Sequence, residues 1–209
     1  VGYLNASGKT VDSLKSVVCG GSACPLSLIQ EMEKHGVSVH MGWGMTEMSP
    51  LGSYNRPMEW MSAGTQAEQD AYLVRAGRIV FGVEMKIVDA DHNELPWNGV
   101  TSGLLLVKGP WVISSYYRSE ESSTLDADGW FDTGDMAAID EYGYVTITDR
   151  VKDVIKSGGE WISSIDVENA AMGHPDVQEA AVIGVADPKW TERPLLIVIP
   201  VEGITPDKD

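Results

Sequence analysis

Residues 14–44, LKSVVCGGSACPLSLIQEMEKHGVSVHMGWG, decide how this chain folds. Residues 14–19 read as a short buried strand that runs into two glycines, and Pro25 then opens an amphipathic helix that stops at Gly36. Residues 37–41 read as a second strand that ends in another glycine. This order predicts a βαβ unit with two parallel strands, and ligands of such sheets bind beyond the carboxyl ends of the strands. The two glycine-rich loops that follow the strands lie at that edge.

The sequence pattern changes at about residue 77. Short segments with alternating apolar residues follow one another. Turns rich in Asp, Asn and Gly are expected between them, at residues 89–91, 97–99, 126–129 and 140–143. The expected strands are residues 84–88, 103–107, 136–139 and 144–148. This pattern predicts a small antiparallel sheet or barrel rather than a continuation of the parallel sheet.

A third pattern begins near Arg150. A helix is expected over residues 165–172, with Ser163 or Ser164 as its N-cap. Strands are expected over residues 177–184 and 195–200, and the sequence ends soon after the second of them.

These patterns together predict an α/β chain in three parts. We expect a partial parallel-sheet subdomain in residues 1–76 and a small antiparallel β-barrel-like subdomain in residues 77–150. Residues 151–209 are expected to form a truncated α+β C-terminal domain.

The composition narrows the class of protein. The 209 residues carry a formal charge of −16, which disfavours binding to nucleic acid or to anionic membranes. No stretch has the ~18–20 consecutive apolar residues that a transmembrane helix needs. Cys19 and Cys24 have neither the spacing nor the histidines of a zinc site, and reduced thiols fit a cytoplasmic location.

The segment after the second strand combines groups suited to a nucleotide. Gly42 and Gly44 permit tight backbone turns, and Trp43 between them offers a flat face for an adenine ring. Thr46 supplies a hydroxyl for a phosphate oxygen, and Glu47 supplies a hard oxygen ligand for Mg²⁺. The alternative interpretation is a glycine turn with a tryptophan in the core.

Two further segments carry charged groups that could contact a nucleotide. Asp135 follows a turn, precedes an expected strand, and could accept hydrogen bonds from both hydroxyls of a ribose. Arg150 could reach a ribose or phosphate oxygen with its planar guanidinium. An aspartate in a β-turn and a solvated charged linker are the simpler interpretations of these two segments.

The order and spacing of these motifs resemble one family. The sequence is similar to acyl-CoA synthetases of the adenylate-forming superfamily, and most similar to medium- and long-chain fatty acyl-CoA ligases, including ligases for methylthio-substituted propionate. The resemblance runs over nearly the whole chain. The motifs that carry it are residues 43–47, 129–135 and 149–156, supported by residues 20–23, 103–110 and 159–163.

The resemblance implies an activity and a nucleotide site. The family forms an acyl-adenylate from a carboxylate and Mg·ATP and releases pyrophosphate. Thr46 would contact the α-phosphate, Glu47 would help to hold Mg²⁺, and Asp135 would bind the ribose hydroxyls. Arg150 would contact the ribose or a phosphate. The adenine pocket would be lined by Gly20, Gly21, Ser22, Trp43 and Gly44.

The resemblance also implies a second half-reaction, in which the C-terminal domain rotates and the thiol of coenzyme A attacks the adenylate. Lys152 would be the hinge residue of this rotation. Lys156, a candidate catalytic residue, and Gly159 would belong to the loop that reaches the active site. Gly159 would line the pantetheine tunnel there.

Two parts of the family pattern are not found within the chain. The phosphate loop would lie upstream of Val1, and the lysine of the adenylation step would lie downstream of Asp209. We therefore expect the chain to be inactive alone and its parent to act on an aliphatic acid, ATP and coenzyme A in fatty acid metabolism. A homodimer is compatible with the sequence. The alternatives are an adenylating domain that loads a carrier protein and a non-catalytic nucleotide-binding remnant.

Overall fold

The computed structural model describes residues 2–8, 11–22, 24–119, 123–158 and 160–204. The chain forms two compact units, of which the first consists of Val1–Thr133 and Ala137–Ile147. The second consists of Gly134–Met136 and Thr148–Asp209. It therefore includes a three-residue segment that lies within the first unit in sequence.

The predicted βαβ unit opens the first unit after a short helix, α1 (Gly2–Ser7). Strand β1 (Ser16–Gly20) pairs in parallel with β2 (Ser38–Gly44), and α2 (Leu26–Lys34) connects them. Helix α2 begins after Pro25, and its only fully buried side chain, among those described, is Ile29. Ile29 packs in a small core with the buried residues Cys24, Val39 and Met41.

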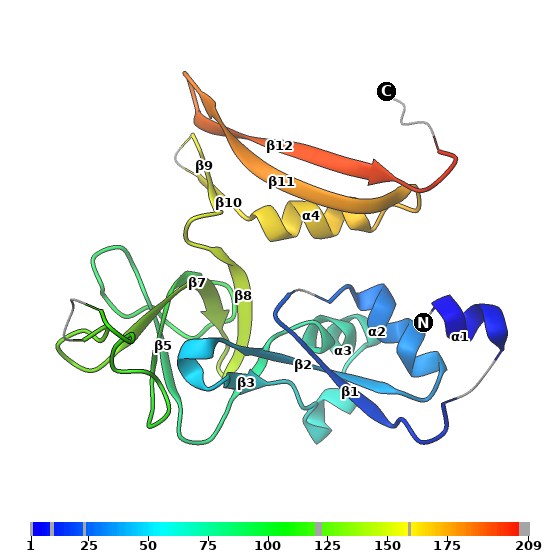
Figure 1. Ribbon diagram of the computed structural model, residues 1–209, viewed down its shortest axis with the longest axis horizontal. Coiled ribbons are helices and arrows are strands. Elements are labelled where there is room, and N and C mark those ends of the chain that lie inside the picture. The colour runs from blue at the N-terminus through cyan, green and yellow to red at the C-terminus, as the bar shows by residue number, and fades with distance from the viewer. Residues whose placement is uncertain (1, 9–10, 23, 120–122, 159, 205–209) are drawn as a thin grey trace. The chain divides into compact units, whose positions relative to one another are not determined.

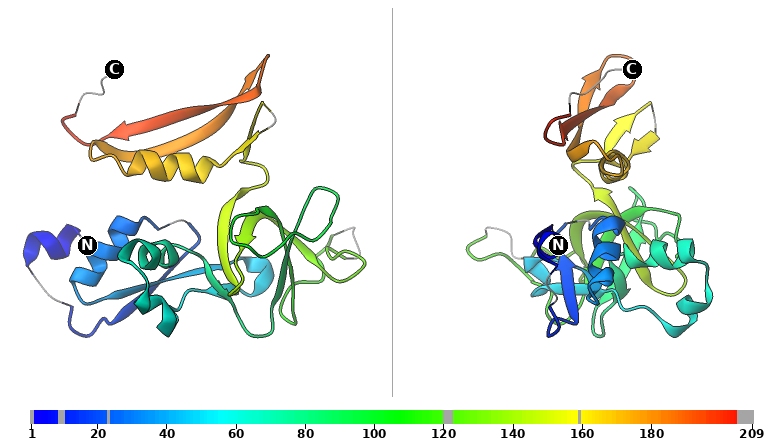
Figure 2. Two further views of the ribbon diagram at one scale, coloured as in Figure 1. Left: turned by 180° about the vertical axis from the view of Figure 1, so that it is seen from behind. Right: turned by 90° about the vertical axis from the view of Figure 1, so that its right-hand side faces the viewer.

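Beyond β2 the sheet continues with antiparallel pairing, first to β3 and then to β4 (Figures 1 and 2). Its strand order is β1-β2-β3-β4-β8-β7-β6-β5, so the antiparallel subdomain continues the sheet that the parallel pair begins. The added strands are β3 (Leu51–Tyr54), β4 (Gly77–Ile79), β5 (Glu84–Val88), β6 (Gly103–Lys108), β7 (Phe131–Ile139) and β8 (Tyr144–Arg150). The other helices of this unit are the 3-10 turns η1 (Thr46–Met48) and η2 (Glu59–Ala63), and α3 (Gln66–Leu73).

Aspartates close the predicted turns of the antiparallel part. Asp89, Asp126 and Asp140 each lie at the start of a turn. In each, Oδ1 accepts the backbone N–H groups two and four residues further on, at 2.8–3.0 Å. A hydrogen bond from the Asn93 side chain also lowers the pKa of Asp89 below its usual range. The carboxylates satisfy backbone donors that the short loops would otherwise leave to solvent.

The main core of the first unit lies on the antiparallel part of the sheet. The strands β5, β6 and β7 supply most of its fully buried side chains, and one residue, Met48, comes from η1. Met48 is 0% exposed, so the turn that carries the predicted phosphate and metal contacts is anchored in this core. The other buried members are Val83, Met85, Ile87, Leu105, Val107, Phe131, Ala137, Ile139 and Val145.

The second unit has a four-stranded antiparallel sheet of order β10-β9-β12-β11. Helix α4 (Ser164–Met172) packs along β11 and β12, on one face of that hairpin (Figures 1 and 2). Ser163 is its N-cap and accepts the Asp166 N–H at 3.1 Å, which selects one of the two predicted caps. The strands are β9 (Ile155–Ser157), β10 (Glu160–Ile162), β11 (Val177–Asp187) and β12 (Thr191–Pro200).

Two local predictions are wrong. Gly42 and Gly44 do not form turns, because β2 runs on to Gly44 and pairs there with β3 through a bulge. Asp135 does not precede a strand, because β7 begins at Phe131 and contains it. In both places the strand is longer than the sequence pattern predicted, because β2 ends later and β7 begins earlier. Within the described residues no helix has the length and apolar character needed to cross a membrane.

Candidate functional site

The glycines of the parallel pair lie side by side at the carboxyl edge of β1 and β2. Gly20 is opposite Gly42 in the register, and a Cβ on Gly20 would come within 2.9 Å of the Gly42 carbonyl oxygen. Gly21 follows with a φ of +85°, a backbone conformation that glycine adopts readily. Together with the exposed Ser22, this edge offers backbone groups at close range to a ligand.

Trp43 is a half-buried residue of β2 that packs against the main core. Gly52 of β3 lies against its ring, since a Cβ there would come within 2.6 Å of Trp43 Cζ3. A Cβ on Gly44 would collide with the Pro50 carbonyl, so this glycine is required by the close approach of the chain after η1. Trp43 thus has the core role of the simpler interpretation. Its stacking on adenine stays a prediction.

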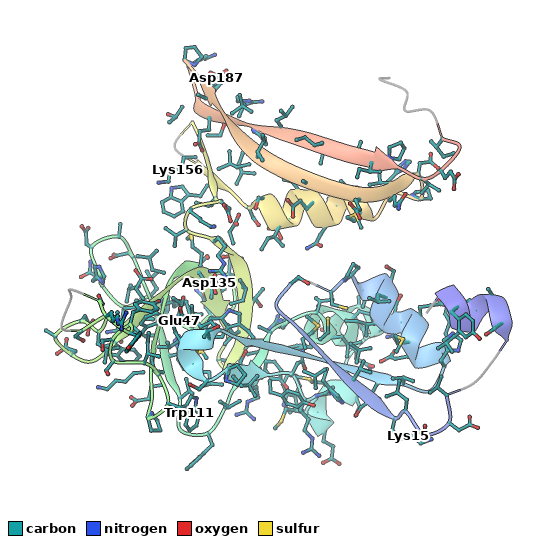
Figure 3. The ribbon with its side chains drawn as sticks, in the orientation of Figure 1. Lys15, Glu47, Trp111, Asp135, Lys156 and Asp187 are labelled. Atoms are coloured by element: carbon teal, nitrogen blue, oxygen red, sulfur yellow. The ribbon has the colours of Figure 1, made fainter. Side chains whose placement is uncertain are left out.

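Thr46 and Glu47 form the first two residues of η1, immediately beyond β2. Thr46 is exposed, Glu47 is half-buried, and Met48 holds the turn in the core. Glu47 Oε1 accepts a hydrogen bond from the Tyr116 hydroxyl at 2.8 Å, and this bond raises the pKa of Tyr116 above its usual value. No described residue donates a hydrogen bond to Oε2 of Glu47. The turn therefore presents a hydroxyl and a partly satisfied carboxylate on consecutive residues (Figure 3 labels Glu47).

The second group of predicted residues lies in the other unit. Asp135 is 3% exposed, and its Oδ1 is 2.8 Å from Nε of Arg150, at the end of β8 (Figure 3 labels Asp135). The Arg150 side chain is 51% exposed, so about half of it remains open to solvent. A buried carboxylate keeps its charge when a cation and hydrogen bonds compensate its desolvation, and Arg150 supplies the cation here.

Asp149 fixes the backbone next to this pair. It is 2% exposed and accepts the Ser164 N–H at 2.7 Å and the Ser164 hydroxyl at 3.1 Å. Its Oδ1 also accepts the Arg150 N–H at 2.7 Å. Asp149 therefore ties the end of β8 to the start of α4.

The predicted hinge and loop residues follow β8 directly. Lys152 is exposed in the turn between β8 and β9, where Asp153 and Val154 both donate to the Arg150 carbonyl at 3.0 Å. Lys156 lies on β9, and its backbone N–H donates to Glu192 Oε2 at 2.8 Å. Gly159 lies outside the described residues.

A cleft of about 370 Å³ in the second unit brings some of these residues together. Arg150 and Lys152 line it on the β8 side, and Glu168 and Glu192 line it as well. Asp149 and Asp153 belong to the lining too, so carboxylates outnumber cations there by four to two.

A magnesium ion would depend on few protein ligands here. Among the described residues, no three His, Cys, Asp or Glu side chains gather closely enough to hold a metal ion. Glu47 alone has a carboxylate oxygen to offer at η1. This fits Mg²⁺ in particular, because that ion usually keeps several waters and is bound by one or two carboxylates together with substrate phosphates.

No pattern in the sequence assigns a role to Tyr116 or Asp149. Tyr116 is 69 residues from Glu47 in sequence, and no local pattern signals that contact. Asp149 belongs to the motif of residues 149–156. Its burial between the end of β8 and the start of α4 depends on tertiary packing, which the motif does not show.

Two family patterns match the chain. Residues 3–117 match the family described as AMP-binding enzyme, and residues 166–209 match the AMP-binding enzyme C-terminal domain. Among curated proteins, the chain is 51% identical over 204 residues to the 3-methylmercaptopropionyl-CoA ligase of Ruegeria pomeroyi, covering 97% of this chain and 38% of the relative. It is 45% identical over 200 residues to the long-chain-fatty-acid–CoA ligase of Thermus thermophilus, covering 95% of this chain and 37% of that ligase. The chain thus spans little more than a third of these relatives.

The chain is also similar to solved structures of CoA ligases. The o-succinylbenzoate CoA synthetase of Bacillus subtilis, in complex with its acyl-adenylate intermediate, superposes with a TM-score of 0.80 at 30% identity. The match covers 98% of this chain and 40% of that one. An anthranilate CoA ligase in complex with anthranoyl-AMP gives a TM-score of 0.79 at 29% identity, covering 97% of this chain and 37% of the other.

Proposed function

The chain belongs to the family of AMP-binding enzymes, and we propose that it is the nucleotide-binding and hinge portion of an AMP-forming acyl-CoA ligase. The proposed enzyme joins a carboxylic acid to coenzyme A at the expense of ATP, through an acyl-adenylate. The observation that carries the proposal is the η1 turn, where a hydroxyl and a carboxylate stand beyond the carboxyl ends of the parallel strands. That is the edge at which sheets of this kind bind ligands.

The first half-reaction brings two anions together, because a carboxylate attacks the α-phosphate of ATP. Catalysis must then come from positioning and from neutralising charge rather than from a protein nucleophile. We assign Thr46 to the α-phosphate and Glu47 to the bound metal, which supplies positive charge at the phosphates. Gly20, Gly21, Ser22, Trp43 and Gly44 are assigned to the adenine pocket.

Asp135 and Arg150 are assigned to the ribose, with Arg150 also able to reach a phosphate. The ion pair between them supports this assignment, because it places a cation against the carboxylate in a buried position. In the second half-reaction the coenzyme A thiol attacks the acyl carbon, and AMP leaves. Lys152 is assigned to the hinge between the two steps, and Lys156 and Gly159 to the loop that serves the thioester step.

The proposed acid is aliphatic. The names of the two curated relatives specify a methylmercaptopropionyl and a long-chain fatty acyl product, and both are aliphatic. Trp43 and Met45 give the β2 end an apolar character that suits such a chain. The proposal extends to a cytoplasmic protein, since both cysteines are free thiols, and it allows a homodimer.

The test uses the complete polypeptide with an aliphatic acid, Mg·ATP and coenzyme A. We expect AMP and pyrophosphate to form in equal amounts, and the acyl thioester to appear only when coenzyme A is present. Adenylate formation with transfer to a carrier protein in place of coenzyme A would favour the carrier-loading alternative. Nucleotide binding without turnover would favour a non-catalytic protein, and release of ADP would contradict the adenylate route.

A further inference from the structure

The long connection between β6 and β7 is tied to the η1 turn at several points. Ile113 donates its N–H to the Glu47 carbonyl at 2.9 Å, and Tyr116 donates its hydroxyl to Glu47 Oε1 at 2.8 Å. Trp111 adds two weaker bonds nearby, because its carbonyl accepts the Ser49 hydroxyl at 3.3 Å and its indole N–H donates to the Leu51 carbonyl at 3.4 Å (Figure 3 labels Trp111 and Glu47). Glu47 is thus held at both its backbone and its carboxylate.

Tyr116 and the next residue, Tyr117, differ sharply in their contacts. Tyr116 is 51% exposed and reaches Glu47, whereas Tyr117 is 87% exposed and its ring lies 5.1 Å from the Arg118 guanidinium. The two neighbouring tyrosines form a matched pair. One contacts the predicted metal ligand, and the other has the same chemistry without that contact.

The kind of bond determines its effect on Glu47. A phenol is a neutral donor, so it restricts the orientation of the carboxylate without cancelling its negative charge. The second oxygen, to which no described residue donates, keeps its lone pairs for a cation. Groups that orient a metal ligand in this way contribute substantially to metal affinity.

We propose that Tyr116 is a positioning residue that orients the Glu47 carboxylate toward a divalent cation bound with ATP. The inference rests on the proposed function, in which Glu47 contacts the metal of Mg·ATP. It adds a residue outside the predicted motifs to the metal site, and it gives the β6–β7 connection a functional role.

The experiment measures Mn²⁺ binding to the complete polypeptide with ATP by electron paramagnetic resonance, because Mn²⁺ takes the same oxygen ligands as Mg²⁺. Tyr116→Phe should weaken Mn²⁺ binding about tenfold, the low end for losing a partner of a metal ligand. Tyr117→Phe should leave it unchanged. AMP affinity without metal should be the same in both variants and in the unmodified protein, as measured by calorimetry.

The results separate the two proposals. If the unmodified protein binds no Mn²⁺ with ATP, the proposed function and the role of Tyr116 both fail. If it binds Mn²⁺ and the two variants match it, only the role of Tyr116 fails. If Tyr116→Phe weakens metal-free AMP binding as much as Mn²⁺ binding, Tyr116 supports the loop in general and the positioning role is overturned.

Discussion

Two carboxylates in different units are placed in contrasting surroundings. Glu47 in the first unit is half-buried, and the partner of its Oε1 is the neutral hydroxyl of Tyr116. Asp135 in the second unit is 3% exposed and is paired with the cation of Arg150. A neutral partner leaves the negative charge of Glu47 available to a metal ion. A cationic partner balances the charge of Asp135 and leaves it to act as a hydrogen-bond acceptor.

The contrast predicts the largest effect for Asp135→Ala in the complete polypeptide. Loss of two hydrogen bonds to a charged acceptor should raise the KM for ATP about 100-fold, at roughly 1.5 kcal/mol or slightly less for each bond. The KM for the carboxylic acid should change little. Steady-state kinetics with each substrate varied separately gives both constants, and Asp132→Ala, an exposed position in the same strand, is the control. Equal rises in both KM values would argue against a ribose role.

Glu47→Gln removes the charge at η1 and keeps the shape of the side chain. Affinity for ATP in the presence of Mg²⁺ should fall about tenfold, the scale of a strong charge-assisted contact. Affinity for AMP without metal should stay the same, whereas Asp135→Ala should weaken AMP binding with or without metal. Calorimetric titrations under both conditions distinguish the two carboxylates. The same metal-independent loss in both variants would remove the contrast drawn between them.

Lys152→Pro tests the connection between the half-reactions. Proline fixes φ near −65°, so thioester formation should fall about tenfold or more while adenylate formation is spared. The Lys152 N–H makes no hydrogen bond to any described residue, so the proline removes none. Pyrophosphate exchange and thioester assays measure the two steps, and Lys152→Ala is the control. A parallel loss of both activities in the proline variant would show that Lys152 is not the hinge.

The smallest effect concerns the scaffold of the second unit. Ser163→Ala removes the N-cap of α4 and the hydroxyl bond to the Thr148 carbonyl at 2.7 Å. The free energy of unfolding should fall by about 1 kcal/mol, the usual cost of losing a cap. Urea denaturation should detect this loss of stability. The affinity of the folded protein for AMP should stay unchanged. A tenfold loss of AMP affinity would show that the N-cap of α4 also contributes to nucleotide binding.

Local patterns in the sequence predicted much of the fold. The apolar periodicity around Ile29 gave α2 and the parallel pair on either side of it, and β5 was predicted with its observed bounds. The turns at Asp126 and Asp140 were predicted because their chemistry lies within five residues. Strands β3 and β4 were missed, since they have four and three residues and no clear alternation.

The site was predictable only as a set of residue types. The motif around Asp135 indicated a position between a turn and a strand, but Asp135 lies inside β7 and is buried there. The contact between Glu47 and Tyr116 spans 69 positions and depends on where the β6–β7 connection lies. Long-range contacts of this kind follow from tertiary packing, which a local pattern does not encode.

The route of one oxygen atom tests the proposed chemistry most directly. The complete polypeptide would be given a carboxylic acid labelled with ¹⁸O in both carboxyl oxygens, together with Mg·ATP and coenzyme A. Attack on the α-phosphate joins one labelled oxygen to phosphorus, and attack of the thiol on the acyl carbon then releases that oxygen with AMP. Mass spectrometry should find one ¹⁸O in AMP and none in pyrophosphate. Label in inorganic phosphate or pyrophosphate, with unlabelled AMP, would contradict the acyl-adenylate route.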